Sequence, residues 1–251
     1  MKRIDQALVD LGLMESREKA KRAVLAGEVR VNGQRAHKPS DPVRDADHVE
    51  LEARERFVSR GGSKLEHALQ HFQIAVEGAR ALDVGASTGG FTDCLLQRGA
   101  SKVFAVDVGH GQLAWKLRQD PRVTVMERIN ARHLRPASFP PEALPFRLIV
   151  VDCSFISLKQ VLPPLISLLD PEGRIVALIK PQFEAGKAEA DRGAGVISDP
   201  MIHERVIREL ATFVRDELKL TWTGVVESPL LGPAGNKEFL VLIEKTARTH
   251  P

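Results

Sequence analysis

Four ionisable side chains occupy places in this chain where a helix or strand is expected to begin or end. They are Lys64, Asp152, Lys180 and Glu238. Asp152 and Lys180 each come directly after an apolar run, whereas Glu238 comes directly before one. Two amines and two carboxylates in one place can orient a hydroxyl group, take up its proton and stabilise the charge that develops. Each residue taken singly has a plainer explanation as a solvated surface charge, so the hypothesis depends on their convergence.

A glycine-rich turn follows an apolar segment at residues 81–91, which read Ala-Leu-Asp-Val-Gly-Ala-Ser-Thr-Gly-Gly-Phe. Glycines let the backbone approach a ligand closely, and the helix that follows offers unbonded N–H groups. The spacing differs from the Gly-x-Gly-x-x-Gly of dinucleotide folds and resembles the first motif of S-adenosylmethionine-dependent methyltransferases. A purely structural turn is the alternative. The candidate cofactor contacts in this turn are Asp83, Gly85, Ala86, Ser87, Gly89, Gly90 and Phe91.

Other polar residues follow apolar segments in the same way. Residues 102–107 end in Asp107, and a carboxylate at the tip of a second strand can accept hydrogen bonds from both ribose hydroxyls of a nucleoside. Asn130 follows a short strand at 123–126, where its amide could meet an adenine edge or simply belong to a loop. Asp152 is a candidate for cofactor binding as well as for catalysis. Together with the glycine-rich turn, Asp107 favours a methyl-donor pocket.

The elements that must position these residues alternate between strand and helix. After the strand before the glycine-rich turn, the expected strands cover residues 102–107, 123–126, 146–151, 173–179, 220–226 and 239–244. This alternation predicts an α/β, doubly wound parallel sheet, whose ligands lie at the carboxyl edge. Residues 158–169 carry the spacing of a crossover helix, although Pro163 and Pro164 should break or kink it. Ser63 is a candidate cap for an earlier helix, and the polar, aperiodic residues 184–197 indicate a mobile loop over the sheet edge.

The first part of the chain carries a surplus of positive charge. Between residues 1 and 38, nine basic residues face five acidic ones, whereas the whole chain has a net charge of only +3. Two apolar helical faces are formed by Ile4, Leu8 and Leu11 and by Ala20, Ala23, Val24 and Leu25. Ser16 is expected to cap the second helix and Gly27 to end it, before a strand at 29–31 and a tight turn. On this pattern alone, a small helical unit with a solvated charged face is the plain interpretation.

Specific motifs extend that interpretation. They are Arg3-Ile4-Asp5, Ser16-Arg17-Glu18-Lys19-Ala20, and the segment from Val24 to the Val-Asn-Gly at residues 31–33. These motifs resemble the S4 RNA-binding domain, which places basic side chains of its second helix and adjoining turns on RNA phosphates. A cluster of cations on one face gives affinity that depends on salt and only weakly on sequence. The resemblance implies RNA contacts by Arg3, Arg17, Lys19, Arg22 and Arg30.

The composition is that of an ordinary globular protein, with 43% hydrophobic and 27% charged residues. The sequence contains no run of eighteen apolar residues and begins without the apolar core of a signal peptide, so a cytoplasmic location away from membranes is expected. Cys94 and Cys153 lack metal-ligand spacing, and no metal site is predicted. The expected domains are an S4-like unit at 1–52, a linker at 53–60 and a methyltransferase unit at 61–251.

The order Lys-Asp-Lys-Glu is similar to the tetrad of RNA 2′-O-ribose methyltransferases. Five motifs accompany it: Ser-Arg-Gly-Gly-x-Lys-Leu, Asp-x-Gly-x-x-x-Gly-Gly-Phe, Val-Asp-x-Ser-Phe-Ile-Ser-Leu, Ile-Lys-Pro-Gln-Phe-Glu and Gly-x-x-Gly-Asn-x-Glu-Phe-Leu. Over essentially its whole length the chain therefore resembles the TlyA family of haemolysin-like ribosomal RNA 2′-O-methyltransferases. The resemblance implies a Rossmann-like domain with a seven-stranded, mostly parallel sheet, preceded by a small α+β S4-like domain. It also implies S-adenosylmethionine as cofactor and ribosomal RNA or ribosomal subunits as partner.

A ribose 2′-hydroxyl is a weak acid, so its methylation requires that the proton be removed or the developing charge be stabilised. Lys180 is the expected central group, either as a base or as an ammonium that orients the hydroxyl. By resemblance the target is a cytidine, while the ribosomal subunit and the oligomeric state stay open. The alternatives are a catalytically inactive RNA-binding or ribosome-assembly factor and, from the family's name, a haemolysin.

Overall fold

The computed structural model describes residues 1–51, 56–186, 189 and 193–245. The chain divides into two compact units, Met1–Glu55 and Arg56–Pro251, and each is described by itself. Part of the predicted linker at 53–60 lies outside the described residues. Phe57, also within that range, is only 4% exposed and packs in a core of the larger unit. The predicted domain boundaries at 52 and 61 stay predictions.

The smaller unit combines two helices with short antiparallel strands. Its elements are β1 (Lys2–Arg3), α1 (Ile4–Asp10), α2 (Arg17–Ala26), β2 (Val29–Val31), β3 (Gln34–Arg35), β4 (Pro42–Val43) and β5 (Val49–Leu51). As predicted, Ser16 caps α2, and its side chain accepts a hydrogen bond from the backbone N–H of Lys19 at 3.3 Å. Gly27 ends the helix with a φ of +76°, a left-handed conformation that favours glycine.

The apolar faces of these two helices meet in one core. Ile4, Leu8 and Val24 are at most 1% exposed and pack together with residues of the short strands. Two residues assigned to these faces are instead exposed: Leu11 by 59% and Leu25 by 69%. Leu11 lies just beyond the end of α1, and Leu25 lies one position around α2 from the buried Val24, where the helix turns away from the core.

The larger unit is built on a seven-stranded sheet with the order β11-β12-β10-β9-β6-β7-β8. The strands are β6 (Arg80–Val84), β7 (Lys102–Val106), β8 (Val123–Met126), β9 (Phe146–Val151), β10 (Leu169–Ile179), β11 (Leu220–Glu227) and β12 (Phe239–Lys245). All neighbours from β10 to β8 are parallel, whereas β12 runs antiparallel to both β10 and β11. This arrangement confirms the predicted fold class.

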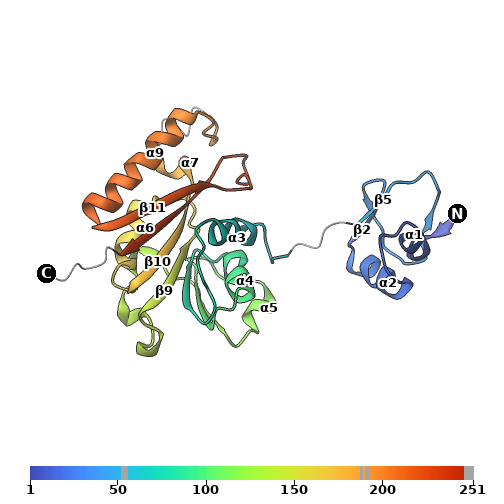
Figure 1. Ribbon diagram of the computed structural model, residues 1–251, viewed down its shortest axis with the longest axis horizontal. Coiled ribbons are helices and arrows are strands. Elements are labelled where there is room, and N and C mark those ends of the chain that lie inside the picture. Colours follow the sequence, from blue (N-terminus) through green and yellow to red (C-terminus); the bar gives the residue numbers. More distant parts are fainter. Residues whose placement is uncertain (52–55, 187–188, 190–192, 246–251) are drawn as a thin grey trace. The chain divides into compact units, whose positions relative to one another are not determined.

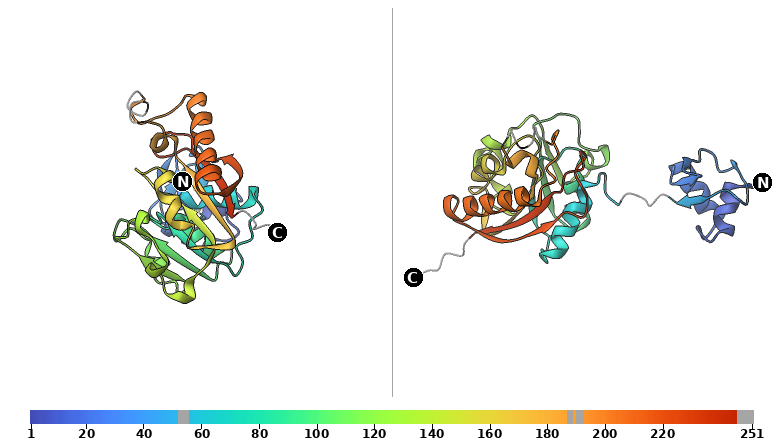
Figure 2. Two further views of the ribbon diagram at one scale, coloured as in Figure 1. Left: turned by 90° about the vertical axis from the view of Figure 1, so that its left-hand side faces the viewer. Right: turned by 90° about the horizontal axis from the view of Figure 1, so that it is seen from above.

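Helices cover both faces of this sheet (Figures 1 and 2). One face carries α3 (Gly61–His71), α4 (Gly90–Gln97) and α5 (Trp115–Arg118), and the other carries α6 (Leu158–Leu165) and α9 (Pro200–Thr212). Successive strand residues supply opposite cores: Leu82 packs on the side of α6, whereas Ala81 packs on the side of α3 and α4. The short helices are α7 (Pro181–Glu184), η1 (Ala131–His133), η2 (Pro136–Ser138), η3 (Pro141–Ala143) and the π-helical η4 (Phe213–Glu217).

Two local predictions change in the structure. Ser63 does not cap α3, because that helix already begins at Gly61. Helix α6 contains both Pro163 and Pro164 and ends at Leu165, so the prolines do not break it where they stand, although it stops short of the predicted residue 169. Within the described ranges, none of the helices has the length and the apolar composition needed to cross a membrane.

Candidate active site

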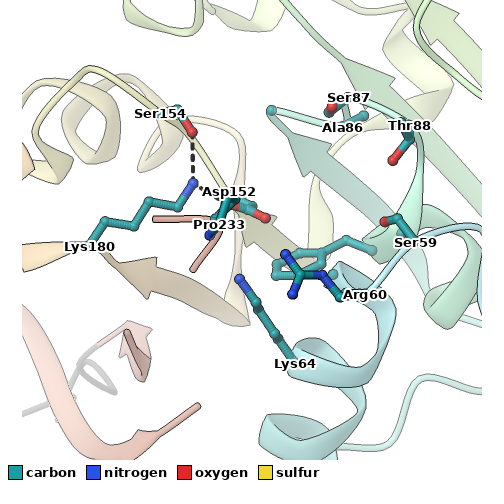
Figure 3. Close-up of a pocket in the computed structure, with 14 residues that line it drawn as sticks. Ser59, Arg60, Lys64, Ala86, Ser87, Thr88, Asp152, Ser154, Lys180 and Pro233 are labelled. Atoms are coloured by element: carbon teal, nitrogen blue, oxygen red, sulfur yellow. Dashed lines mark hydrogen bonds and ion pairs between the residues drawn. The ribbon is translucent and has the colours of Figure 1, made fainter. Parts of the chain in front are cut away.

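A pocket opens at the carboxyl edge of the parallel strands, beside the glycine-rich turn (Figure 3). Its lining consists of Ser59, Arg60, Gly61, Lys64, Gly85, Ala86, Ser87, Thr88, Gly90, Phe91, Asp152, Ser154, Lys180 and Pro233. These residues come from the start of α3, the turn after β6, the tips of β9 and β10, and the loop before β12. The fold therefore brings Lys64, Asp152 and Lys180 to one place, and Glu238 joins them through Lys64.

The first ion pair joins the tips of two adjacent parallel strands. Lys180 follows β10 directly and Asp152 follows β9 directly, so the pairing of these strands brings both side chains to one edge. The Nζ atom of Lys180 lies 2.6 Å from Oδ1 of Asp152 and donates a hydrogen bond to Oγ of Ser154 at 2.8 Å. Figure 3 shows the ammonium group of Lys180 at this junction.

The second ion pair joins segments that are far apart in the sequence. Lys64 stands in the first turn of α3, and Glu238 immediately precedes β12. The Nζ atom of Lys64 lies 2.5 Å from Oε2 of Glu238, and the two side chains are 9% and 1% exposed. Removing either partner would leave a buried charge without its counterion, which is strongly destabilising. The two partners therefore hold the start of α3 against the start of β12.

Two glycines of the turn are required by the packing of the protein, independently of any ligand. Gly85 has a φ of +87°, and a Cβ atom there would lie only 2.5 Å from the backbone oxygen of Asp152. A Cβ atom on Gly90 would lie 2.3 Å from Oγ of Ser59. Real Cβ atoms do not approach neighbours so closely, so both positions exclude a side chain. The turn therefore lets Asp152 and Ser59 come close enough to form two walls of the pocket.

Comparison with known proteins assigns this chain to a family. Residues 57–245 match the FtsJ-like methyltransferase family, and residues 2–49 match the S4 domain. The chain belongs to the FtsJ-like methyltransferases. The predicted resemblance to the TlyA group of these enzymes is confirmed by relatives of nearly the same length.

The similar proteins cover almost the whole chain. The 16S/23S rRNA (cytidine-2′-O)-methyltransferase TlyA of Mycobacterium tuberculosis is 49% identical over 245 residues, which are 95% of this chain and 88% of that protein. A Bacillus subtilis protein provisionally named rRNA methyltransferase YqxC is 47% identical over 240 residues, 95% of this chain and 84% of that protein. A solved Streptococcus thermophilus structure, provisionally named hemolysin, has a TM-score of 0.74 and 45% identity, covering 98% of this chain and 88% of that one.

Several predicted cofactor contacts of this methyltransferase lie beside the pocket lining rather than in it. Asp107 accepts hydrogen bonds from the backbone N–H of Ser87 at 2.7 Å and of Gly109 at 2.6 Å. Asn130 caps η1, because its Oδ1 atom accepts from the backbone N–H of Arg132 at 3.1 Å. Through its bonds to Ser87 and Gly109, Asp107 connects the glycine-rich turn to the loop after β7. Gly89 also lies outside the lining; it immediately precedes α4 and has a φ of +98°.

Asp83 lies beneath the turn and is fully buried. Its Oδ2 atom accepts a hydrogen bond from Oγ1 of Thr92 at 2.6 Å, while its Oδ1 atom has no hydrogen-bond partner among the described residues. Burial, reinforced by the nearby charge of Asp152 and opposed by the bond from Thr92, raises the pKa of Asp83 to about 7. Asp83 therefore braces the first turn of α4 from inside the core.

Two residues that follow Asp152 belong to a motif of the family resemblance but were not predicted as site residues. Ser154 accepts the hydrogen bond from Lys180, and Phe155 is 90% exposed with its ring centroid 5.0 Å from that of Phe183. Phe155 also has a φ of +62°, which is unusual for a bulky residue. The available signal in the sequence was an aromatic residue in the loop that follows β9, directly after Ser154. Its exposure in the structure shows that the ring is not part of the core.

Glu184 holds together the two loops that carry the first ion pair. Its carboxylate accepts from Oγ of Ser157 at 2.6 Å and from the backbone N–H of Leu158 at 2.7 Å. Burial raises the pKa of this carboxyl above its usual value. Part of the predicted loop at 184–197 lies outside the described residues. Its last residues are bound by Asn236, whose side chain bonds the backbone of Gly195 and Ile197.

The candidate RNA contacts of the smaller unit lie at its surface. Four of them form hydrogen bonds or ion pairs within the unit, and Arg22 is exposed. Arg3 and Arg17 both bond Asp5, Lys19 pairs with Glu15, and Arg30 donates to the backbone oxygen of Gly33. These side chains reach the surface without entering the core.

Replacing Asp83 by asparagine should flatten the pH dependence of stability. The folded pKa of about 7 lies above the ordinary 3.8, so stability from the protonated carboxyl is present at low pH and is lost as pH rises through about 7. The shift corresponds to a loss on the order of 4 kcal/mol. Urea unfolding between pH 4 and 8 measures it, because the loss accumulates between the unfolded and the folded pKa, with the exposed Asp216→Asn as control. Identical pH profiles for Asp83→Asn and wild type would contradict this account.

Proposed function

We propose that this methyltransferase uses S-adenosylmethionine to methylate the 2′-hydroxyl of a cytidine in ribosomal RNA. The observation that carries the proposal is the convergence of the Lys180–Asp152 pair and Lys64 beside the glycine-rich turn in one pocket. Relatives with nearly half of their residues identical, one of them named for cytidine 2′-O-methylation of rRNA, support the substrate. A ribosomal substrate would place the enzyme in the cytoplasm.

The backbone of the glycine-rich turn and the carboxylate of Asp107 suit the binding of a positively charged nucleoside. When bound, S-adenosylmethionine supplies a methyl group on a cationic sulfur. The backbone of Gly85, Ala86 and Ser87 lines the pocket wall that would face it. The carboxylate of Asp107 has further lone pairs beyond its two backbone bonds and can accept from ribose hydroxyls. The side-chain amide of Asn130 would hydrogen-bond to the adenine base of the cofactor.

Lys180 is the proposed proton acceptor for the ribose hydroxyl. For this step Lys180 must first release one proton from its ammonium group to solvent; the O–H bond of the 2′-hydroxyl then breaks and its proton moves to the free amine at Nζ. The resulting ammonium would be held by the contacts that surround Nζ, namely the carboxylate of Asp152 and the hydroxyl of Ser154. Because these partners come from the neighbouring strand tip, they also set the direction in which Nζ approaches the substrate.

Lys64 has a different proposed role. Its ammonium borders the pocket, while Glu238 holds it from the buried side. An ammonium oriented in this way stabilises negative charge that develops on the 2′-oxygen when the proton leaves. The S4 unit would add affinity for the RNA backbone through its arginines and lysines, independent of the reacting nucleotide.

The proposal is tested by incubating the protein and methyl-labelled S-adenosylmethionine with separated ribosomal subunits. We expect label at a 2′-oxygen of cytidine, located by nuclease mapping of the modified RNA. Label only on protein, on a nucleobase or on small molecules would exclude this reaction. RNA binding without any label would instead support the alternative of a catalytically inactive assembly factor.

Replacing Lys180 by alanine should abolish methyl transfer and spare cofactor binding. The variant lacks the proton acceptor, so we expect a loss of turnover of about 100-fold or more. Initial rates on ribosomal subunits measure turnover, and calorimetry measures the dissociation constant of S-adenosylmethionine. The exposed Lys159→Ala serves as a control for loss of a positive charge nearby. Near-normal turnover of Lys180→Ala would refute the assignment.

Replacing Phe155 by alanine should weaken use of the RNA without changing cofactor affinity. The exposed ring adjoins Ser154 and can stack on the base of the target nucleotide, an interaction worth about 1–3 kcal/mol per base. We therefore expect kcat/KM for RNA to fall roughly 5- to 100-fold. Phe155→Tyr keeps the ring and should restore most of the activity. Equal losses in both variants would argue against stacking.

A further inference from the structure

Asp5 is a charged residue with an unusual environment in the smaller unit. It lies in the first turn of α1 and is 0% exposed. Its backbone N–H donates to the carbonyl of Pro39 at 3.2 Å, so the residue is also anchored through its main chain. A carboxylate that is this deeply buried requires partners for both of its oxygens.

Those partners are two arginines from different elements. Nε and Nη2 of Arg3 donate to Oδ1 and Oδ2 of Asp5 at 3.0 and 3.1 Å. Nη2 of Arg17 donates to Oδ2 of the same carboxylate at 3.2 Å. Arg3 precedes α1 and Arg17 begins α2, so a single carboxylate sets the relative position of two guanidinium groups.

Both guanidinium groups keep hydrogen-bonding capacity toward solvent. A guanidinium has five N–H donors, and the bonds to Asp5 occupy two of those on Arg3 and one on Arg17. The side chains of Arg3 and Arg17 are each 50% exposed, although the carboxylate between them is fully covered. With two positive charges and one negative charge, the cluster keeps a net charge of +1.

Two ion pairs elsewhere in this unit offer a contrast. Lys19 pairs with Glu15 and Lys21 with Glu18, and the two acids are 81% and 72% exposed. Such pairs lie in solvent on flexible side chains and contribute little order. The hydrogen bonds from Arg3 and Arg17 hold the pKa of Asp5 down to about 2, so its carboxylate stays ionised at any working pH.

We propose that Asp5 is a positioning residue, which holds Arg3 and Arg17 as a preorganised pair of donors for a phosphodiester group of the bound RNA. This inference rests on the proposed function, in which the smaller unit holds RNA. Planar guanidinium groups match phosphate oxygens in bidentate geometry, and arginines that are already ordered lose less conformational freedom on binding. The acid thus strengthens binding to a polyanion although its own charge opposes it.

The sign of one substitution separates positioning from simple charge. Asp5→Asn raises the net charge of the unit by one, so electrostatics alone predicts tighter RNA binding. Loss of the carboxylate also releases the two arginines, so positioning predicts weaker binding. Glu15→Gln raises the net charge by the same amount at an exposed acid next to the candidate contact Lys19, and it is the matched control.

The experiment measures binding of the full chain to a fluorescently labelled, structured RNA hairpin at several salt concentrations. We expect Asp5→Asn to bind about tenfold more weakly than wild type and Glu15→Gln to bind equally well or more tightly. We also expect the slope of log K against log salt to become shallower by about one for Asp5→Asn, as the contact to one phosphate is lost. A merely unfolded fraction would reduce the active concentration and leave this slope unchanged.

A second variant tests the same inference if Asp5→Asn fails to fold. The double variant Arg3→Lys/Arg17→Lys keeps the charge but loses the planar fork, and both side chains are half exposed. We expect it to bind RNA more weakly than the double variant Arg35→Lys/Arg44→Lys, which changes two exposed arginines of the same unit outside the candidate contacts. Binding of Asp5→Asn as tight as that of Glu15→Gln, or equal binding by the two lysine variants, would overturn the inference. Since the assay needs no methyl transfer, failure of the proposed reaction is recognised separately by wild-type protein that binds RNA without methylating it.

Discussion

The active-site region depends on the close approach of two strand tips at Gly85. The backbone oxygen of Asp152 occupies the space that a side chain on residue 85 would need. The adjacent ladder continues this contact, since the backbone N–H of Asp152 donates to Val84 and that of Gly85 to Val106. The turn, the tip of β9 and the tip of β7 are therefore locked together. Lys180 meets Asp152 only because β10 then continues the same parallel register.

Charge is distributed in this region so that each ammonium has its own acid. Lys180 pairs with Asp152 and Lys64 with Glu238, which allows two amines to border one small pocket. A third acid beneath them is treated differently. Among the described residues Asp83 forms no ion pair, and its pKa rises to about 7 because burial and the charge of Asp152 disfavour its ionised form. The neutral form of Asp83 thus serves the packing of α4, while the charged pairs serve the pocket.

The sequence predicted the fold class and the meeting of Asp152 with Lys180 from strand periodicity, whereas Lys64 and Glu238 were added through the family resemblance. Once apolar runs are taken as parallel strands, residues after them must share one edge, which accounts for Asp152 and Lys180. It could not predict contacts that arise only when distant segments pack. The start of α3 at Gly61 rather than at Ser63, the exposure of Leu25, and the bonds of Glu184 to Ser157 are of this kind. Phe155 was visible as a residue type, but only its 90% exposure separates it from a core aromatic.

The two units share one physical device, a carboxylate whose role is to orient a cation. In the larger unit, Glu238 is 1% exposed and directs Lys64. In the smaller unit, Asp5 is 0% exposed and directs two arginines. A buried acid loses the free energy of its hydration, and only well-formed hydrogen bonds compensate for this loss. It therefore restricts the position and orientation of its partners more than an exposed acid would. This is why the net charge of the chain says little about RNA affinity. The same number of cations on freely moving side chains would have to be ordered by the RNA itself, at the expense of binding free energy.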